Sequence, residues 1–374
     1  MDSAASNPGL IVVWGGFALA FAFGAVANKT NFCAMGALSD IVNMGHWGRM
    51  RMWLLAMAVA ILGAGALVYS GQVDLSKAVT QRPVLTWLSL LVGGLAFGVG
   101  MTLSGGCANK NLVRLGGGSV RSLVVLVFMG IAAYMTLKGL FGQWRASWLD
   151  PVAVNLASMG WKDQSLTNAV SSLSGLAAPT ALLATVAALV LALLVFVLKD
   201  KRFRANTLQL AGAVALGALV VAGWYVSGHL GYGENPETLE FVYFATNSRG
   251  IESLSFVGPV AYSLELLMLW TDKSLHMSLG VASVLGVVLG SAAYALAAGR
   301  FRWEGFASLD DLRNQLVGAG LMGFGGVTAM GCTIGQGLTG VSTLAIGSFI
   351  ALAGIIGGSV AMLKYTLWRE EHDA

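Results

Sequence analysis

Long apolar stretches separated by short polar ones dominate the chain. Most of them approach or exceed the ~20 residues that an α-helix needs to cross a bilayer core about 30 Å thick. The short alternating segments typical of a membrane β-barrel do not occur. The pattern therefore predicts an all-α polytopic membrane protein with about nine or ten membrane helices. The expected apolar segments are 10–27, 53–70, 85–103, 120–137, 177–198, 207–227, 256–270, 275–298, 316–330 and 343–363.

Several of these segments are interrupted. Segment 256–270 is short for a full crossing and is expected to be re-entrant or part of a broken helix. The three cysteines of the chain lie where apolar sequence gives way to small and polar residues. Interrupted helices in lipid must line a polar cavity or be buried in protein, so three thiols in such settings predict a substrate path. Each cysteine follows a glycine by nine residues: Gly24 and Cys33, Gly98 and Cys107, Gly323 and Cys332.

The chain contains an internal repeat. In the "cysteine alignment" the sequence is shifted so that Cys107 falls on Cys332. In the "phenylalanine alignment" the shift is one residue smaller, and Phe32 falls on Phe256 and Cys33 on Val257. We interpret the chain as a single transmembrane domain, 1–374, built of two homologous halves, about 1–175 and 200–374. Duplicated halves with paired helix breaks predict a pseudo-symmetric inverted repeat of the transporter type. Within window 91–107 the cysteine alignment gives seven identities at seventeen positions: Leu91/Leu316, Val92/Val317, Gly93/Gly318, Gly98/Gly323, Gly100/Gly325, Gly106/Gly331 and Cys107/Cys332.

Composition and charge narrow the class further. The chain is 56% hydrophobic and only 11% charged, and its mean hydropathy is +0.74. A net charge of +4 is ordinary for a membrane protein with basic cytoplasmic loops and does not indicate nucleic acid. Histidines and cysteines lack metal-ligand spacing, and no nucleophile or phosphate-binding motif occurs, so neither an enzyme, a metal nor a cofactor is expected. The basic stretches 46–51 and 199–204 are expected on the cytoplasmic side of the membrane, and loop 234–252 is expected on the other side.

Polar and basic residues beside the cysteines favour an anion as substrate. Acidic residues are absent from 28–38, 103–120 and 320–348, whereas a cation site would want carboxylates. Two other interpretations stay open. The basic side chains could extend to the interface, and the cysteines could serve as small packing residues. The candidate binding residues are Cys33, Cys107 and Cys332 with Lys29, Asn31, Lys110, Asn111, Thr333 and Gln336.

Three motifs surround the cysteines: Asn31-Phe32-Cys33-Ala34-Met35-Gly36, Gly105-Gly106-Cys107-Ala108-Asn109-Lys110-Asn111-Leu112-Val113-Arg114 and Gly331-Cys332-Thr333-Ile334-Gly335-Gln336-Gly337. They resemble the YeeE/YedE family of bacterial membrane proteins, which includes thiosulfate transporters. The resemblance implies thiosulfate uptake across the bacterial inner membrane into the cytoplasm, with the three cysteines passing the ion along the pore by hydrogen bonding. In some members a small TusA-like sulfur-carrier protein works with the transporter.

A mechanism follows from the chemistry of the ion. Thiosulfate has a soft terminal sulfur and three hard oxygens, and neutral thiols can donate weak hydrogen bonds to it, whereas a thiolate would repel it. Weak repeated contacts let an ion both enter and leave. Three alternatives remain at this point: a membrane sulfurtransferase with a cysteine nucleophile, a small-anion channel that does not depend on thiols, and a selenium-compound transporter, as in other members of the family.

Overall fold

The computed structural model describes residues 8–236, 238–306 and 308–373, and in these the chain is mostly helical with very little sheet. The long helices are α1 (Pro8–Thr30), α3 (Gly48–Tyr69), α4 (Trp87–Leu103), α6 (Val120–Lys138), α9 (Ala178–Leu198), α11 (Thr207–Tyr225), α13 (Leu279–Ala297), α14 (Leu309–Thr328) and α15 (Ile346–Asp373). The shorter helices are α2 (Ala34–Met44), α5 (Ala108–Gly116), α7 (Leu140–Trp148), α8 (Leu166–Ser174), α10 (Lys201–Ala205) and α12 (Val257–Met268).

Single turns and short strands complete the chain. The 3-10 turns are η1 (Leu75–Lys77), η2 (Val79–Gln81) and η3 (Leu156–Met159), and the π-helical turns are η4 (Val226–Leu230) and η5 (Gly335–Gly340). The strands form two antiparallel pairs, β1 (Val84–Leu85) with β2 (Val154–Asn155) and β3 (Tyr232–Glu234) with β4 (Phe241–Tyr243).

Eight helical stretches of the described residues are long and apolar enough to cross a membrane, and α12 is a shorter apolar helix. The prediction of an all-α polytopic membrane protein is therefore confirmed. The α14 helix begins at Leu309, well before the expected segment 316–330. The reason is local: Ser308 caps it by accepting the N–H of Asp311 at 3.1 Å, and acidic residues in a first turn complement the helix dipole.

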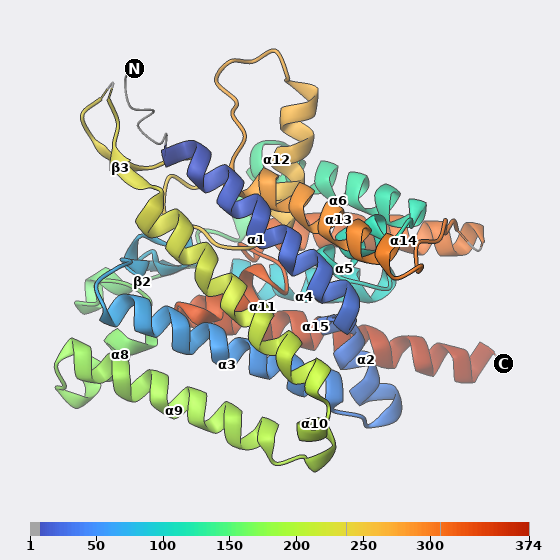
Figure 1. The fold of residues 1–374 in the computed structure, drawn as a ribbon, viewed down its shortest axis with the longest axis horizontal. Helices are drawn as coiled ribbons and strands as arrows, with labels where there is room; N and C mark the ends of the chain where they lie inside the picture. Colours follow the sequence, from blue (N-terminus) through green and yellow to red (C-terminus); the bar gives the residue numbers. More distant parts are fainter. Residues whose placement is uncertain (1–7, 237, 307, 374) are drawn as a thin grey trace.

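Packing of the long helices follows the repeat. The cysteine alignment relates α4 to α14, α5 to η5 and α6 to α15. Helix α4 packs on α15 as α14 packs on α6, and α1 packs on α13 as α3 packs on α11. Figure 1 shows α1 and α11 side by side and antiparallel. We propose on this basis that two inverted halves form one domain, of which residues 1–7 and 374 lie outside the described part.

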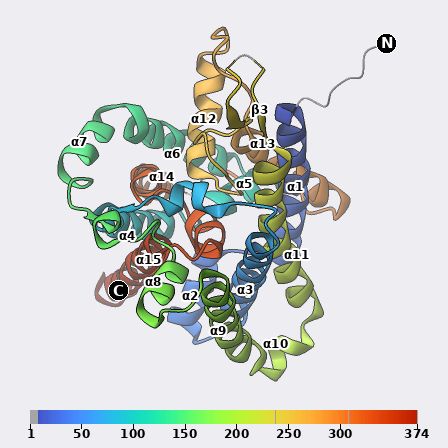
Figure 2. The ribbon, with the colours of Figure 1, turned by 90° about the vertical axis from the view of Figure 1, so that its left-hand side faces the viewer.

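The bundle has two ends, which Figure 1 shows at the left and at the right. The "β3 end" holds β2, β3 and α8, and α1 begins there. The "α10 end" holds α2 and α10, and α15 ends there. Figure 2, seen along the long axis, places α7 at one edge of the bundle and α9 with α10 at another. These peripheral elements have no counterpart in the repeat, so the paired helices form the centre.

The glycine nine residues before each cysteine marks a close helix crossing. A Cβ added to Gly98 would lie 2.2 Å from the carbonyl oxygen of Ile355 on α15, so no side chain fits. Small residues let membrane helices approach to this distance. The other two glycines meet neighbouring backbone in the same way, Gly24 at Val287 and Gly323 at Met129. The spacing noted in the sequence therefore reflects one structural unit used three times: a tight crossing followed by a break.

Candidate functional site

The three helix breaks share one backbone conformation. The residue two positions before each cysteine is left-handed, with φ of 54° at Asn31, 65° at Gly105 and 56° at Met330. The following residue then donates its N–H to the carbonyl five positions back, which ends the helix with a satisfied turn. These bonds are Phe32 N–H to Ala27 at 3.0 Å, Gly106 N–H to Met101 at 2.9 Å and Gly331 N–H to Gly326 at 2.7 Å.

Each cysteine starts the helical turn that follows its break. Its carbonyl accepts the N–H four residues ahead, from Ala37 for Cys33 and from Asn111 for Cys107, both at 3.0 Å. The Cys33 sulfur accepts the N–H of Gly36 at 3.3 Å, and the Cys332 sulfur that of Gly335 at 3.4 Å. The thiols therefore sit where backbone N–H groups converge, and such positions suit an anion.

The breaks of the two halves meet in the middle of the protein. The thiols of Cys33 and Cys107 lie close enough to interact electrostatically, and the hydroxyl of Thr333 lies near Cys107. All three cysteines are buried, with exposed fractions of 6%, 1% and 0% for Cys33, Cys107 and Cys332. Three segments that are far apart in the sequence thus supply one cluster of soft, weakly polar groups.

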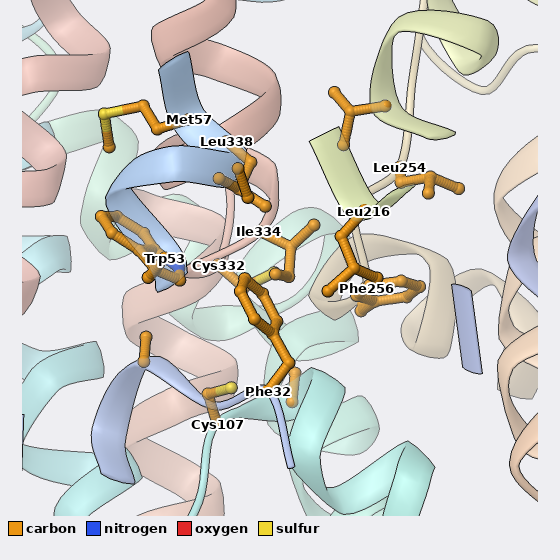
Figure 3. Close-up of a cluster of buried hydrophobic side chains, with 14 of the residues drawn as sticks. Phe32, Trp53, Met57, Cys107, Leu216, Leu254, Phe256, Cys332, Ile334 and Leu338 are labelled. Atoms are coloured by element: carbon orange, nitrogen blue, oxygen red, sulfur yellow. The ribbon is translucent and has the colours of Figure 1, made fainter. Parts of the chain in front are cut away.

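Apolar side chains surround this cluster. Figure 3 shows Cys107 and Cys332 in one buried group with Phe32, Phe256 and Ile334. The two phenylalanines are the pair that defines the phenylalanine alignment, and neither is more than 2% exposed. Both rings belong to the buried apolar cluster in which the breaks of the two halves meet.

Two cations lie on the α10 side of Cys33 and Cys107. Lys110 Nζ donates to Asn31 Oδ1, and Arg114 Nη1 donates to the carbonyl of Gly105 at 2.9 Å. Among the described residues no carboxylate pairs with either cation. Both line a cavity of about 140 Å³ at the α10 end, together with Arg300. Arg302 and Glu304 also line this cavity, so four basic side chains share it with one carboxylate and this end carries net positive charge.

A larger cavity opens toward the β3 end. Its volume is about 770 Å³, and its lining reaches Met330 and Gly331, directly before Cys332. Arg82 and Arg145 line it, as does Asp150. Glu252 lies in an adjoining cavity of about 160 Å³ that also reaches Met330. Burial raises the pKa of this carboxyl. The two cavities thus approach the cysteine cluster from the β3 end, opposite the cationic cavity.

The residues predicted from the sequence differ in their position relative to the thiols and in their hydrogen bonds. Asn111 uses its amide N–H groups on the carbonyls of Gly106 at 3.1 Å and Cys107 at 3.2 Å, so it holds the break in shape. Gln336, its repeat partner, donates to the carbonyl of Ala329 at 2.6 Å and leaves its Oε1 unpaired. Lys29 is exposed, and no contact brings it to the thiols. The remaining candidates belong to the cluster or border it.

Sequence reasoning left two features of the site unassigned. Asn109 was not selected, although it stands between Cys107 and Lys110. Phe32 and Phe256 were noted only as aligned positions, not as members of the buried cluster around the thiols. The repeat offered a signal for Asn109, because the cysteine alignment places it on apolar Ile334. A polar residue that replaces an apolar one at matched positions of a buried site indicates a local function.

Paired helix breaks, buried thiols and cavities approaching from both ends define a membrane transporter rather than an enzyme. The chain matches the family described as Sulphur transport over residues 29–361 and belongs to it. It is 27% identical over 365 residues to the thiosulfate transporter TsuA of Spirochaeta thermophila, covering 94% of this chain and 98% of the relative. It is 25% identical over 352 residues to the thiosulfate transporter TsuA of Escherichia coli, covering 90% of this chain and 89% of the relative. The class is that of sulfur-anion transporters.

Proposed function

We propose that this protein takes up thiosulfate into the cytoplasm through a central pore lined by cysteine thiols. The observation that carries the proposal is the convergence of Cys33 and Cys107 beside Thr333, next to cations that no described carboxylate neutralises. Soft sulfur atoms suit the terminal sulfur of the ion, and the cations suit its charge. Both relatives carry the name thiosulfate transporter, which supports this choice among sulfur anions.

The path that we propose runs from the β3 end to the α10 end. An ion in the large cavity reaches Cys332 next to Gly331. It then passes an apolar constriction that Phe32 and Phe256 would form, and contacts Cys107 and Cys33. Neutral thiols donate weak hydrogen bonds, which hold the ion briefly without trapping it. Lys110 and Arg114 draw the dianion onward into the cationic cavity. Movement of the phenylalanine pair opens the constriction.

The other candidate residues take supporting roles in this proposal. Asn31 positions the Lys110 ammonium, and Asn111 fixes the turn that presents Cys107. Thr333 offers a hydroxyl at the cluster, and Gln336 offers an unpaired amide oxygen that can hold a thiol or a water in place. Lys29, exposed near the end of α1, adds positive potential at the exit.

The distribution of basic residues supports an orientation in a bacterial inner membrane. The α10 end carries Arg49 and Arg51 in the first turn of α3 and Lys201, Arg202 and Arg204 in α10, whereas the β3 end mixes Asp74 and Asp163 with Lys77 and Lys162. Basic loops remain on the cytoplasmic side of membrane proteins. We therefore orient the α10 end inward and the β3 end outward. A TusA-like sulfur-carrier protein, as in some family members, would receive the ion at the α10 end.

Uptake by purified protein in liposomes tests the proposal. Radiolabelled thiosulfate enters vesicles that contain the wild-type protein. We expect Cys107→Ala to lower the rate at least about tenfold, because the central donor is lost. Cys107→Ser keeps a donor and should retain more activity. Competition by unlabelled selenium and sulfur anions ranks the substrates. Wild-type vesicles that exclude thiosulfate would contradict the proposal.

The same liposomes distinguish the transporter from the two other functions, a sulfurtransferase and an anion channel that does not depend on thiols. A sulfurtransferase would accumulate a persulfide on Cys107 or Cys332 without filling the vesicles, and mass spectrometry of the protein would detect it. A channel in which the cysteines only fill space would transport at the wild-type rate after treatment with a thiol-blocking reagent. Thiol-sensitive uptake without a stable persulfide is the result that we expect.

A further inference from the structure

One side chain in the centre of the site is buried without a partner. Asn109 lies in the first turn of α5 and is 1% exposed. Neither its amide oxygen nor its amide nitrogen has a hydrogen-bond partner among the described residues. The neighbouring amide, Asn111, by contrast donates to two carbonyls. Asn109 therefore does not serve to hold the break together.

A buried amide without partners lowers the stability of the folded protein unless a bound ligand supplies the missing hydrogen bonds. A buried amide that lacks its bonds is destabilising relative to an apolar residue of the same size. Most buried polar groups in proteins are paired, so an unpaired one requires an explanation. The repeat shows that the position does not itself demand an amide, because Ile334 occupies it in the other half and lies beside Cys332 in Figure 3.

The neighbours of Asn109 define the chemistry of what it binds. Cys107, two residues before it, supplies a thiol, and Lys110, immediately after it, supplies a cation. At the matched positions of the other half, Lys110 corresponds to Gly335. The amide, the thiol and the cation thus occur together in one half only. An anion that carries both a soft sulfur and hard oxygens uses all three.

We propose that Asn109 is a substrate-binding residue whose amide nitrogen donates to a sulfonate oxygen of the ion while the thiols of Cys33 and Cys107 contact its terminal sulfur. This inference rests on the proposed function. It assigns the recognition of oxygen to Asn109, whereas the cysteines recognise sulfur. The structure thereby gives the α5 break a built subsite for ions that are oxygenated at one end only. No covalent step is involved.

Two variants of Asn109 test the inference. Asn109→Leu removes the amide and keeps the volume, so we expect the KM for thiosulfate uptake to rise about tenfold, as for a lost hydrogen bond to a charged group. The melting temperature of the protein without thiosulfate should stay equal or rise, because an unpaired buried amide has been removed. Asn109→Asp has nearly the same shape and should raise KM further, since a carboxylate repels the dianion, and lower pH should partly restore uptake.

Gln315→Leu serves as the matched control. Gln315 is also a buried amide with an unpaired oxygen, but it lies near the start of α14 and bonds to Asp311. We expect this variant to leave the KM for thiosulfate unchanged. Thiosulfate should raise the melting temperature of the wild type and of Gln315→Leu, and should raise that of Asn109→Leu much less.

The possible results are distinguishable. An unchanged KM in Asn109→Leu overturns the inference while thiosulfate transport by the wild type stands. A large fall in the melting temperature of Asn109→Leu without thiosulfate also overturns it, because the amide would then have a structural partner. Failure of the wild type to transport thiosulfate rejects the proposed function itself. A raised KM with retained stability supports both.

Discussion

The break between α4 and α5 and the break between α14 and η5 have the same backbone and different chemistry. Both end a helix with a left-handed residue, and both place a cysteine at the start of the next turn. Beyond the cysteine they diverge. The first carries Asn109, Lys110 and Arg114, and the second carries Ile334, Gly335 and Thr339 at the matched positions.

This difference shows that scaffold and chemistry are separable in a duplicated protein. Backbone geometry is retained in both halves because it satisfies the hydrogen bonds of an interrupted helix. Side chains are free to differ, and the packing explains where. A Cβ at Gly335 would lie 2.4 Å from the Ser255 hydroxyl oxygen, so the second break has no room for a counterpart of Lys110. The second break therefore carries no cation at the position that Lys110 occupies in the first.

A substitution at the close helix crossing before the first break tests the shared backbone and should have the largest effect. Gly98→Ala places a methyl group against the carbonyl of Ile355, which cannot move aside. Overpacking of this kind costs ~1–3 kcal/mol or more, and we expect the largest loss of folded protein from it. Gly320→Ala on α14 points into open space and should be tolerated. Melting temperatures and yields of monodisperse protein in detergent measure both. Equal behaviour of the two variants would contradict the close crossing.

Exchanging the residues at the other pair of matched breaks tests the asymmetry directly. Cys33→Val gives the first half the side chain of Val257, removes one thiol donor and should lower thiosulfate uptake at least about tenfold. Val257→Cys changes a buried residue of similar volume on the opposite side and should leave uptake within about twofold. The measurement is the initial rate in liposomes. Similar losses in both variants would show that the two halves contribute equally.

Removal of the Lys110 charge beside the first break should lower uptake less than removal of the Cys33 thiol does. Lys110→Met keeps the aliphatic stem and removes a charge that no described carboxylate neutralises, so uptake should fall roughly fivefold at low salt. The loss should shrink as ionic strength rises, because salt screens the attraction. Lys364→Met, at an exposed position on α15, is the charge-matched control. If both variants transport at the wild-type rate, Lys110 does not attract the ion.

The smallest effect concerns the outer cavity. Glu252 is a carboxyl in the wall of a cavity on the path of an anion, and Glu252→Gln should raise uptake about twofold at neutral pH by removing repulsion. Burial raises the pKa of Glu252, so protonation of the wild type sets in above the ordinary glutamate range as pH falls. The advantage of the variant should therefore disappear as the medium is acidified. An advantage that persists after the carboxyl has been protonated would exclude electrostatic repulsion.

Much of this fold could be predicted from the sequence because hydropathy determines which segments cross a membrane. The breaks could also be predicted, since cysteines follow left-handed turns at Gly105 and Asn31 in otherwise apolar helices. The early start of α14 was missed because a Ser308 cap, rather than hydropathy, fixes it. Local capping bonds are not visible in a hydropathy pattern.

The site was only partly predictable for a different reason. Spacing along the chain identified each thiol, but the contact of Cys33 with Cys107 depends on how α1 and α4 are packed by their neighbours. Asn111 and Asn109 look equivalent in sequence, yet one bonds to backbone and the other has no partner among the described residues. Only the three-dimensional arrangement distinguishes an amide that supports the fold from one available to a ligand.

The central claim is that the ion rests at the α5 break and not at its matched counterpart. Selenosulfate, in which selenium replaces the terminal sulfur of thiosulfate, would locate it by anomalous scattering in crystals. The account predicts a selenium peak next to the thiols of Cys33 and Cys107, with the sulfonate oxygens directed at Asn109 and Lys110. A peak confined to the surroundings of Cys332 and Ile334, with none at the α5 break, would contradict it.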